Sequence, residues 1–180
     1  MRRPIIALAA AALMAGAAFA NEAELARGAE LLAPFKRELQ TALREGLAEG
    51  PSHAIGACRL RGPQIGESLS RDGVRVGRTS HRLRNPANAS PEWVQPILDA
   101  YLANADDRAP RVAQLGEGRA GYVEPIVMQP LCESCHGDPL SPDLVQPIRD
   151  LYPEDRAVGF HAGELRGVFW VEFPRGGAIP

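Results

Sequence analysis

Two thiols and an imidazole stand together in the segment Cys132-Glu133-Ser134-Cys135-His136. Two residues separate the cysteines, and the histidine follows the second one directly. This spacing is typical of a c-type haem attachment site. Both sulfurs can reach the two vinyl groups on one edge of a porphyrin as thioethers, and the histidine then lies beneath the ring as an iron ligand. We therefore expect one covalent haem c, held by Cys132 and Cys135, with His136 as the proximal ligand.

The N-terminal segment predicts export. A short basic start precedes an almost wholly apolar run, and Ala18-Phe19-Ala20 offers the small residues that a signal peptidase recognises. We expect residues 1–20 to be a signal peptide, cleaved before Asn21, and the mature protein to be periplasmic or otherwise exported. A membrane anchor is the weaker alternative, because the apolar run is shorter than the roughly 20 residues that span a bilayer.

Three alternatives to haem fit the motif less well. A redox-active dithiol of the thioredoxin-like kind would place the cysteines at a helix start after a strand, and it does not require the histidine. A zinc site could combine Cys132, Cys135 and Cys58 with a histidine, but such sites usually show two paired sets of ligands. Chance occurrence of the spacing is the third alternative. An exported chain with this motif and no other cysteine pair favours haem.

The ligand opposite His136 is not determined by the motif. No methionine follows His136, in contrast to class I cytochromes, and Met128 lies so close before the motif that it suits packing better than ligation. Cys58 is a third, unpaired thiol that an exported protein would leave open to oxidation. As a thiolate it suits ferric iron, and as a buried small hydrophobe it needs no ligand role. The remaining candidates are His53, His81 and His161.

Hydrophobic periodicity predicts helices at the front of the chain. One long amphipathic helix is expected over residues 22–49, and Gly50-Pro51 ends it. The same proline opens a second, short helix through about Cys58, and Gly62-Pro63 predicts another turn. A further helix is expected from an N-cap at Ser90.

Strands are predicted mainly in the second half. Residues 74–79 alternate after a turn, and residues 116–127 are strand-like after a glycine-rich turn. A short helix is expected over residues 144–151, and residues 157–173 are predicted to form a hairpin around Gly163. The prediction is one α+β domain over residues 21–180.

Composition excludes several functions. The net charge is −2 and no basic stripe stands out, so a nucleic-acid partner is not expected. No long apolar stretch follows the signal segment, so the mature chain should not span a membrane. No acid–base pair can be named from spacing, so we do not expect an enzyme.

Several short stretches, spread over nearly the whole mature chain, match one family in a single order. They are Gly50-Pro51, Ala54-Ile55, Cys58, residues 76–80, residues 83–86, Asn88, residues 124–126, residues 131–137, Tyr152-Pro153, Asp155, Ala157, Gly159, Gly163 and Arg166-Gly167. In these residues the chain resembles the Tll-like haem domains, exported c-haem modules with a PAS-like fold that also occur as sensory parts of larger signalling proteins.

The resemblance implies an antiparallel sheet flanked by helices, with Cys58 as the second iron ligand opposite His136. Arg78, Arg84 and Asn85 lie in matching stretches and are candidates for contacts with the haem propionates. A thiolate ligand favours ferric iron, which predicts a low reduction potential. We expect low-potential electron transfer with a redox partner protein. The alternative is a redox or gas sensor that passes a ligand switch to a signalling partner.

Overall fold

The computed structural model describes residues 5–176, with side chains from Asn21 onward. The predicted signal peptide, residues 1–20, lies outside the residues whose side chains are described, so export stays a prediction. Over the part described with side chains, no helix combines the length and the apolar character that a membrane crossing requires.

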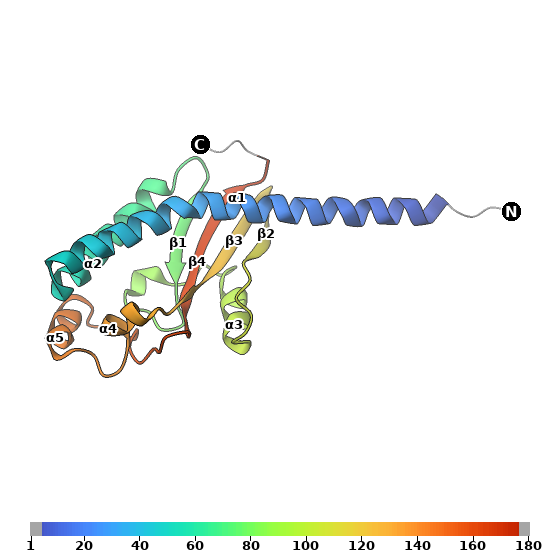
Figure 1. Cartoon of the computed structure of the whole chain (residues 1–180). Helices are drawn as coiled ribbons and strands as arrows, with labels where there is room; N and C mark the ends of the chain where they lie inside the picture. Colours follow the sequence, from blue (N-terminus) through green and yellow to red (C-terminus); the bar gives the residue numbers. More distant parts are fainter. Residues whose placement is uncertain (1–4, 177–180) are drawn as a thin grey trace.

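Two helices form an antiparallel hairpin over one face of the sheet (Figure 1). They are α1 (Ile5–Glu49) and α2 (Pro51–Leu69), and Gly50 joins them with φ 119°, a conformation that suits glycine. The helices approach closely near this joint, because a Cβ on Gly46 would lie 2.7 Å from the Cα of Ala54. The predicted end of the first helix at residue 49 is confirmed.

Helix α2 is longer than predicted. The expectation of a short helix to about Cys58, with a turn at Gly62-Pro63, is wrong, since α2 continues to Leu69. An interior proline costs a helix about 3 kcal/mol. Packing offsets this cost, because Ile65 is buried in the main core cluster against Leu32 and Phe35 of α1. Cys58 therefore lies within a helix and not at its end.

Four antiparallel strands form one sheet in the order β1-β4-β3-β2. They are β1 (Arg75–Thr79), β2 (Arg111–Gly116), β3 (Arg119–Val127) and β4 (Leu165–Pro174). The strands predicted at residues 74–79 and 116–127 are confirmed as β1 and β3. Strand β2 was not predicted, because as a half-buried edge strand it has a weak hydrophobic alternation.

The predicted hairpin over residues 157–173 is wrong. Only its second arm is a strand, β4, which lies in the middle of the sheet between β1 and β3. The first arm is a loop that pairs with the motif segment instead. The amide of Phe160 donates to the carbonyl of His136 at 2.9 Å, and the amide of Gly163 donates to the carbonyl of Met128 at 2.9 Å.

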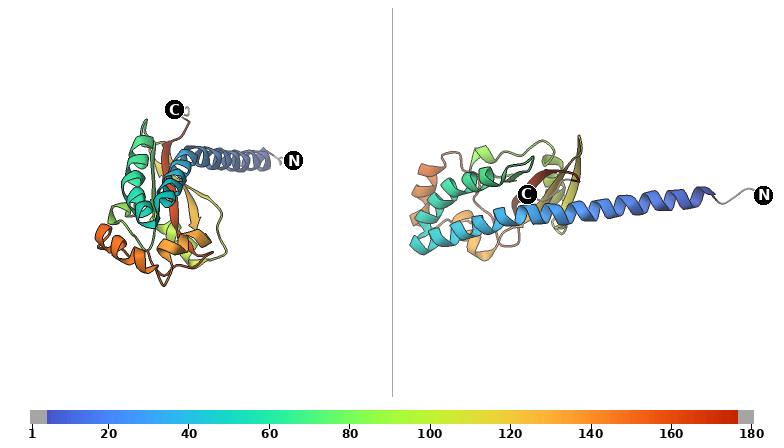
Figure 2. Two further views of the ribbon diagram at one scale, coloured as in Figure 1. Left: turned by 60° about the vertical axis from the view of Figure 1, so that its left-hand side comes forward. Right: turned by 90° about the horizontal axis from the view of Figure 1, so that it is seen from above.

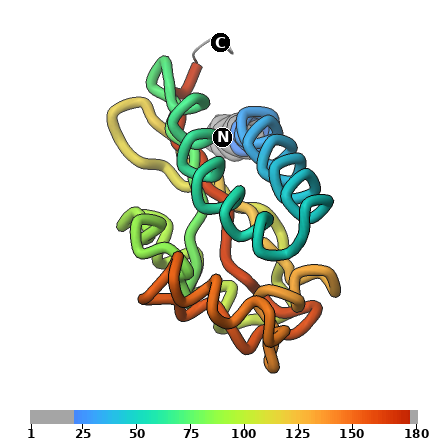
Figure 3. Tube along the Cα trace, turned by 90° about the vertical axis from the view of Figure 1, so that its left-hand side faces the viewer, coloured from blue at the N-terminus to red at the C-terminus, as the bar shows by residue number. Residues whose placement is uncertain are grey.

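The other helices lie on the far face and at one end of the sheet, as the further views show (Figure 2). Helix α3 (Gln95–Ala103) begins later than predicted, because residues 92–94 form a turn and Pro96 stands in the first helical turn. Helix α5 (Pro142–Leu151) is close to its predicted position and packs against α2 (Figure 3). Three short helices are η1 (Pro86–Asn88), η2 (Pro130–Cys132) and α4 (Glu133–His136).

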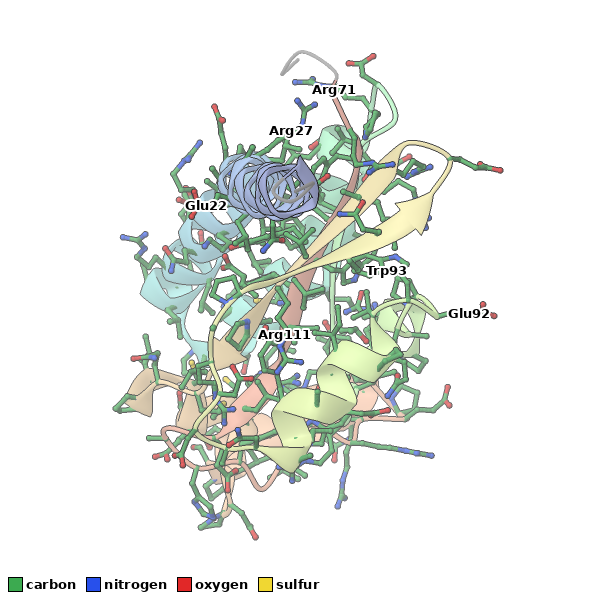
Figure 4. The ribbon with its side chains drawn as sticks, turned by 90° about the vertical axis from the view of Figure 1, so that its right-hand side faces the viewer. Glu22, Arg27, Arg71, Glu92, Trp93 and Arg111 are labelled. Atoms are coloured by element: carbon green, nitrogen blue, oxygen red, sulfur yellow. The ribbon has the colours of Figure 1, made fainter. Side chains whose placement is uncertain are left out.

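Apolar side chains fill both faces of the sheet. The cluster under α1 and α2 contains Val76 and Tyr122, and the cluster under α3 contains Leu98 and Trp170. Trp93, labelled in Figure 4, lies between α3 and the sheet, where only a glycine at position 121 leaves room for its ring. The predicted class is confirmed: α+β, with a PAS-like antiparallel sheet flanked by helices and a long N-terminal helix.

The contact of α1 with the sheet depends on a glycine. A Cβ on Gly28 would lie 2.3 Å from the Cβ of Tyr122, so Gly28→Ala should reduce the free energy of unfolding by about 1–3 kcal/mol. Gly56 is the matched control, since nothing lies within 4 Å of its Cβ position on α2. Gly56→Ala should stabilise the protein by about 0.5–1 kcal/mol. Urea denaturation followed by circular dichroism measures both, and equal effects would contradict this packing.

Candidate functional site

The motif lies on two short helical turns that follow β3. Cys132 ends η2, and Cys135 and His136 lie in α4. The two thiols meet different apolar clusters. Cys132 packs against Met128, Ala157 and Phe160, whereas Cys135 packs against the cluster of Ile55, Leu144, Ile148 and Tyr152. Cys58, Cys132 and Cys135 are all free thiols.

His136 is held in one tautomer. Its Nδ1 lies 2.7 Å from the carbonyl oxygen of Ala157, and because a carbonyl only accepts, Nδ1 carries the proton. The lone pair therefore lies on Nε2, the atom that a metal ion would use. Burial, aided by the positive charges of Arg166 and Arg84, lowers the pKa of His136 to about 2. The imidazole is neutral at physiological pH, as a metal ligand must be.

Arg84 links the motif to the loop before β4 through hydrogen bonds and an ion pair. Its guanidinium pairs with the carboxylate of Asp155 at 3.0 Å and donates to the carbonyl of Cys135 at 2.6 Å and of Ala157 at 3.2 Å. Asp155 in turn accepts from the amide of Ala157 at 2.7 Å. Ala157 is also the residue that fixes His136. Nε and Nη2 of Arg84 are thus engaged with the chain itself, where they position the motif.

The two other propionate candidates differ from each other. Asn85 accepts a hydrogen bond from the amide of Ala87 at 3.0 Å and so caps η1. Arg78 lies in β1, and among the residues described with side chains it has no carboxylate or carbonyl partner. Burial lowers the pKa of Arg78, while the negative charge of the Cys58 thiolate acts in the opposite direction. Arg78 is therefore a partly buried cation that lacks an anion.

Cys58 reaches the motif from a distant part of the chain. Burial raises the pKa of its thiol, and the nearby guanidinium groups of Arg78 and Arg84 partly offset this effect. Burial also raises the pKa of the Cys135 thiol, and the charge of Cys58 adds to that rise. The packing agrees with this proximity, because Cys135 of α4 packs against the cluster that contains Ile55, a residue of α2 three positions before Cys58.

The other ligand candidates are Met128 and three histidines. Met128 is buried in the cluster beside Cys132, which fits packing. His53 and His161 are exposed, and His81 meets the edge of Phe160 at 5.6 Å between ring centroids. His53 lines a hollow of about 420 Å³ and His81 one of about 360 Å³, and no motif residue lines either hollow.

Arg166 and Phe160 belong to the site but were not singled out as candidates from the sequence. Phe160 meets the ring of His136 edge-on at 6.4 Å, and the guanidinium groups of Arg82 and Arg166 lie 3.6 and 5.0 Å from its centroid. Burial next to Arg78 and Arg84 lowers the pKa of Arg166 to about 9. The only sequence signal for Arg166 was its place in the family pattern. The site is consequently electropositive and suits an anionic group.

The donor set fits iron better than zinc. Within the described residues, no three His, Cys, Asp or Glu side chains gather to hold a metal ion by themselves. A zinc site formed by the three cysteines and a histidine thus has no support in the geometry. One neutral imidazole and one soft sulfur, set among apolar clusters, instead match the two axial positions of a haem iron.

Comparisons with known proteins agree with this fold. The Tll0287-like family model matches residues 17–174. Among solved structures, the chain is similar to the crystal structure of the cyanobacterial haem protein Tll0287, with 24% identity and a TM-score of 0.64. That match covers 88% of this chain and 99% of the other. A search of curated proteins found no match. The resemblance inferred from the sequence is confirmed, and the chain belongs to the Tll0287-like family.

Proposed function

We propose that this chain is an exported mono-haem c-type cytochrome. The haem is attached to Cys132 and Cys135, and His136 and Cys58 are the axial ligands of the iron. One observation carries the proposal: a neutral imidazole, held at Nδ1 by Ala157, stands within the attachment motif, and the motif packs beside α2, the helix that carries the free thiol of Cys58. The description of Tll0287 as a haem protein supports the same cofactor here.

The surroundings of these residues fit a haem. The clusters beside Cys132 and Cys135 offer apolar contacts for a macrocycle, and the arginines around His136 offer positive charge for its propionates. Arg84 and Asn85 already bind the chain itself, so any propionate contact they make comes in addition to those bonds. The propionate roles of Arg78, Arg84 and Asn85 stay predictions.

Low-potential electron transfer is the function that these ligands support best. A bound haem would supply one-electron redox chemistry. Cys58, as a thiolate, adds a negative charge that favours the ferric state and lowers the reduction potential. If both His136 and Cys58 hold the iron, no ligand position would be left for a small molecule. We propose a carrier that serves a redox partner protein and is not an enzyme.

A sensor is the second candidate, and one observation favours it. Burial raises the pKa of the Cys58 thiol, which favours the neutral thiol over the thiolate that would hold the iron. Without Cys58 as a ligand, the site would have room for carbon monoxide or nitric oxide. In that case a signalling partner would respond to the loss of the Cys58 bond.

Absorption spectra of the purified exported protein test the proposal. The reduced wild type should show a c-type spectrum, and the ferric bands should change in Cys58→Ala because the thiolate is lost. His81→Ala is the matched control and should leave the ferric bands unchanged. Identical bands in wild type and Cys58→Ala would remove Cys58 as a ligand. Carbon monoxide added to the reduced wild type separates the functions, because a carrier should not bind it and a sensor should.

A further inference from the structure

Arg78 points toward the helical hairpin. It stands in β1 opposite Phe169 of β4, two residues after Val76. Side chains two apart on a strand share a face, and Val76 is buried in the cluster under α1 and α2. The guanidinium of Arg78 therefore extends from the sheet toward α2.

The guanidinium of Arg78 lies next to Gly62 of α2. A Cβ on Gly62 would lie 3.3 Å from Nη2 of Arg78. Gly62 follows Cys58 by four residues on α2, so the two positions are neighbours on one face of the helix, with Cβ positions about 5–6 Å apart. The guanidinium thus lies against the face of α2 that carries Cys58.

The neighbouring arginines already have partners. Arg84 pairs with Asp155, and Arg166 donates to the hydroxyl of Ser80 at 2.8 Å. Arg82 donates to the carbonyl of Val158 at 2.8 Å. Across the residues described with side chains, no such partner meets Arg78. A cation that is partly withdrawn from water and has no anion beside it is unfavourable, so an anion is expected at this place.

Few groups qualify as that anion. Glu124 shares the sheet face of Arg78, but Phe169 stands between them in the strand register, and Glu124 pairs with Lys36 at 2.5 Å. Among the described groups, Cys58 and Tyr152 are the ones whose negative charge would act on Arg78. A thiol ordinarily ionises at a lower pH than a phenol, so Cys58 supplies that charge more readily than Tyr152.

We propose that Arg78 is the charge partner of Cys58. Its guanidinium lies against the face of α2 that carries the sulfur and pairs with it in the thiolate form that would hold a haem iron. The inference rests on the proposed function, and it makes Arg78 a positioning residue, because it acts on the iron through Cys58. It also gives Gly62 a role, since a Cβ at this position would crowd the guanidinium, at 3.3 Å from Nη2.

The test measures how much of the ferric holoprotein has Cys58 bound. Electron paramagnetic resonance at pH 7 separates thiolate-bound low-spin iron from iron without this ligand. Arg78→Gln should lower the ratio of bound to unbound species about tenfold, the effect of removing a charge-assisted hydrogen bond. Arg78→Lys should restore most of the ratio. Arg78→Met gives the same readout in a variant that keeps the apolar stem and buries no new amide.

A second variant, Cys58→Met, distinguishes an effect of Arg78 on the Cys58 sulfur from an effect on a haem propionate. In Cys58→Met the ligand is a neutral sulfur, so Arg78→Gln should leave the spectrum and the reduction potential nearly unchanged. An equal shift of potential in both backgrounds would mean that Arg78 serves a propionate, and the inference would be overturned. Unchanged spectra in the native background would overturn it as well. A wild-type protein without any thiolate signature would overturn the proposed function together with the inference.

Discussion

Replacing Cys132 and Cys135 together by serine should abolish covalent haem in the exported protein. Each sulfur is proposed to form one thioether, so their loss leaves only axial bonds, which acid and organic solvent break. Denaturing electrophoresis with a haem stain, followed by mass spectrometry of the intact chain, measures the result. The wild type should keep its haem through this treatment, and the double variant should keep essentially none.

The third cysteine supplies the matched control for this experiment. Cys58 is a free thiol like the other two, but it lies in α2 and is proposed to bind iron and not a vinyl group. Cys58→Ser should therefore retain covalent haem while its ferric spectrum changes. Covalent haem in the double serine variant, or its loss in Cys58→Ser, would contradict the assignment of the thioethers.

The local part of the site could be predicted from the sequence. The two cysteines and His136 are neighbours along the chain, so their spacing alone indicated the chemistry. Cys58 was different, because α2 comes to lie beside the motif only through its packing with α5 and with the cluster that Cys135 joins. The expectation that Cys58 acts with the motif came from the family resemblance and the unpaired thiol, and no residue pattern encodes it directly.

Long-range contacts account for the parts of the fold that sequence reasoning missed. Pro63 predicted a turn, yet burial of Ile65 against α1 keeps α2 intact. The segment before β4 looked like a hairpin arm, yet its amides bond to His136 and Met128. The cations around Phe160 come from two segments more than 80 residues apart, as Arg82 and Arg166 show. Such partners become visible only when the chain is folded.

Arg84→Ala should destabilise the protein more than other single ion-pair changes. The pair of Arg84 with Asp155 is buried, with 12% and 8% of the two side chains exposed. Removing the arginine leaves the carboxylate of Asp155 buried without its charge partner, and it frees the carbonyl of Cys135 from a 2.6 Å hydrogen bond. The expected loss in the free energy of unfolding is about 3–5 kcal/mol. Urea denaturation of the purified holoprotein measures it.

Arg75→Ala is the control that removes an exposed arginine from an ion pair, whereas Arg84→Ala removes a buried one. Arg75 also pairs with a buried carboxylate, that of Glu172, but 59% of the arginine side chain is exposed. Glu172 would keep its bonds to Arg119 at 2.8 Å and to the indole of Trp93 at 2.7 Å, so the loss should stay below about 1 kcal/mol. Because Arg84 also binds the backbone beside His136, Arg84→Ala should in addition broaden the ferric spectrum, which Arg75→Ala should not do. Equal losses of stability in the two variants, with unchanged spectra, would mean that Arg84 does not hold the motif in place.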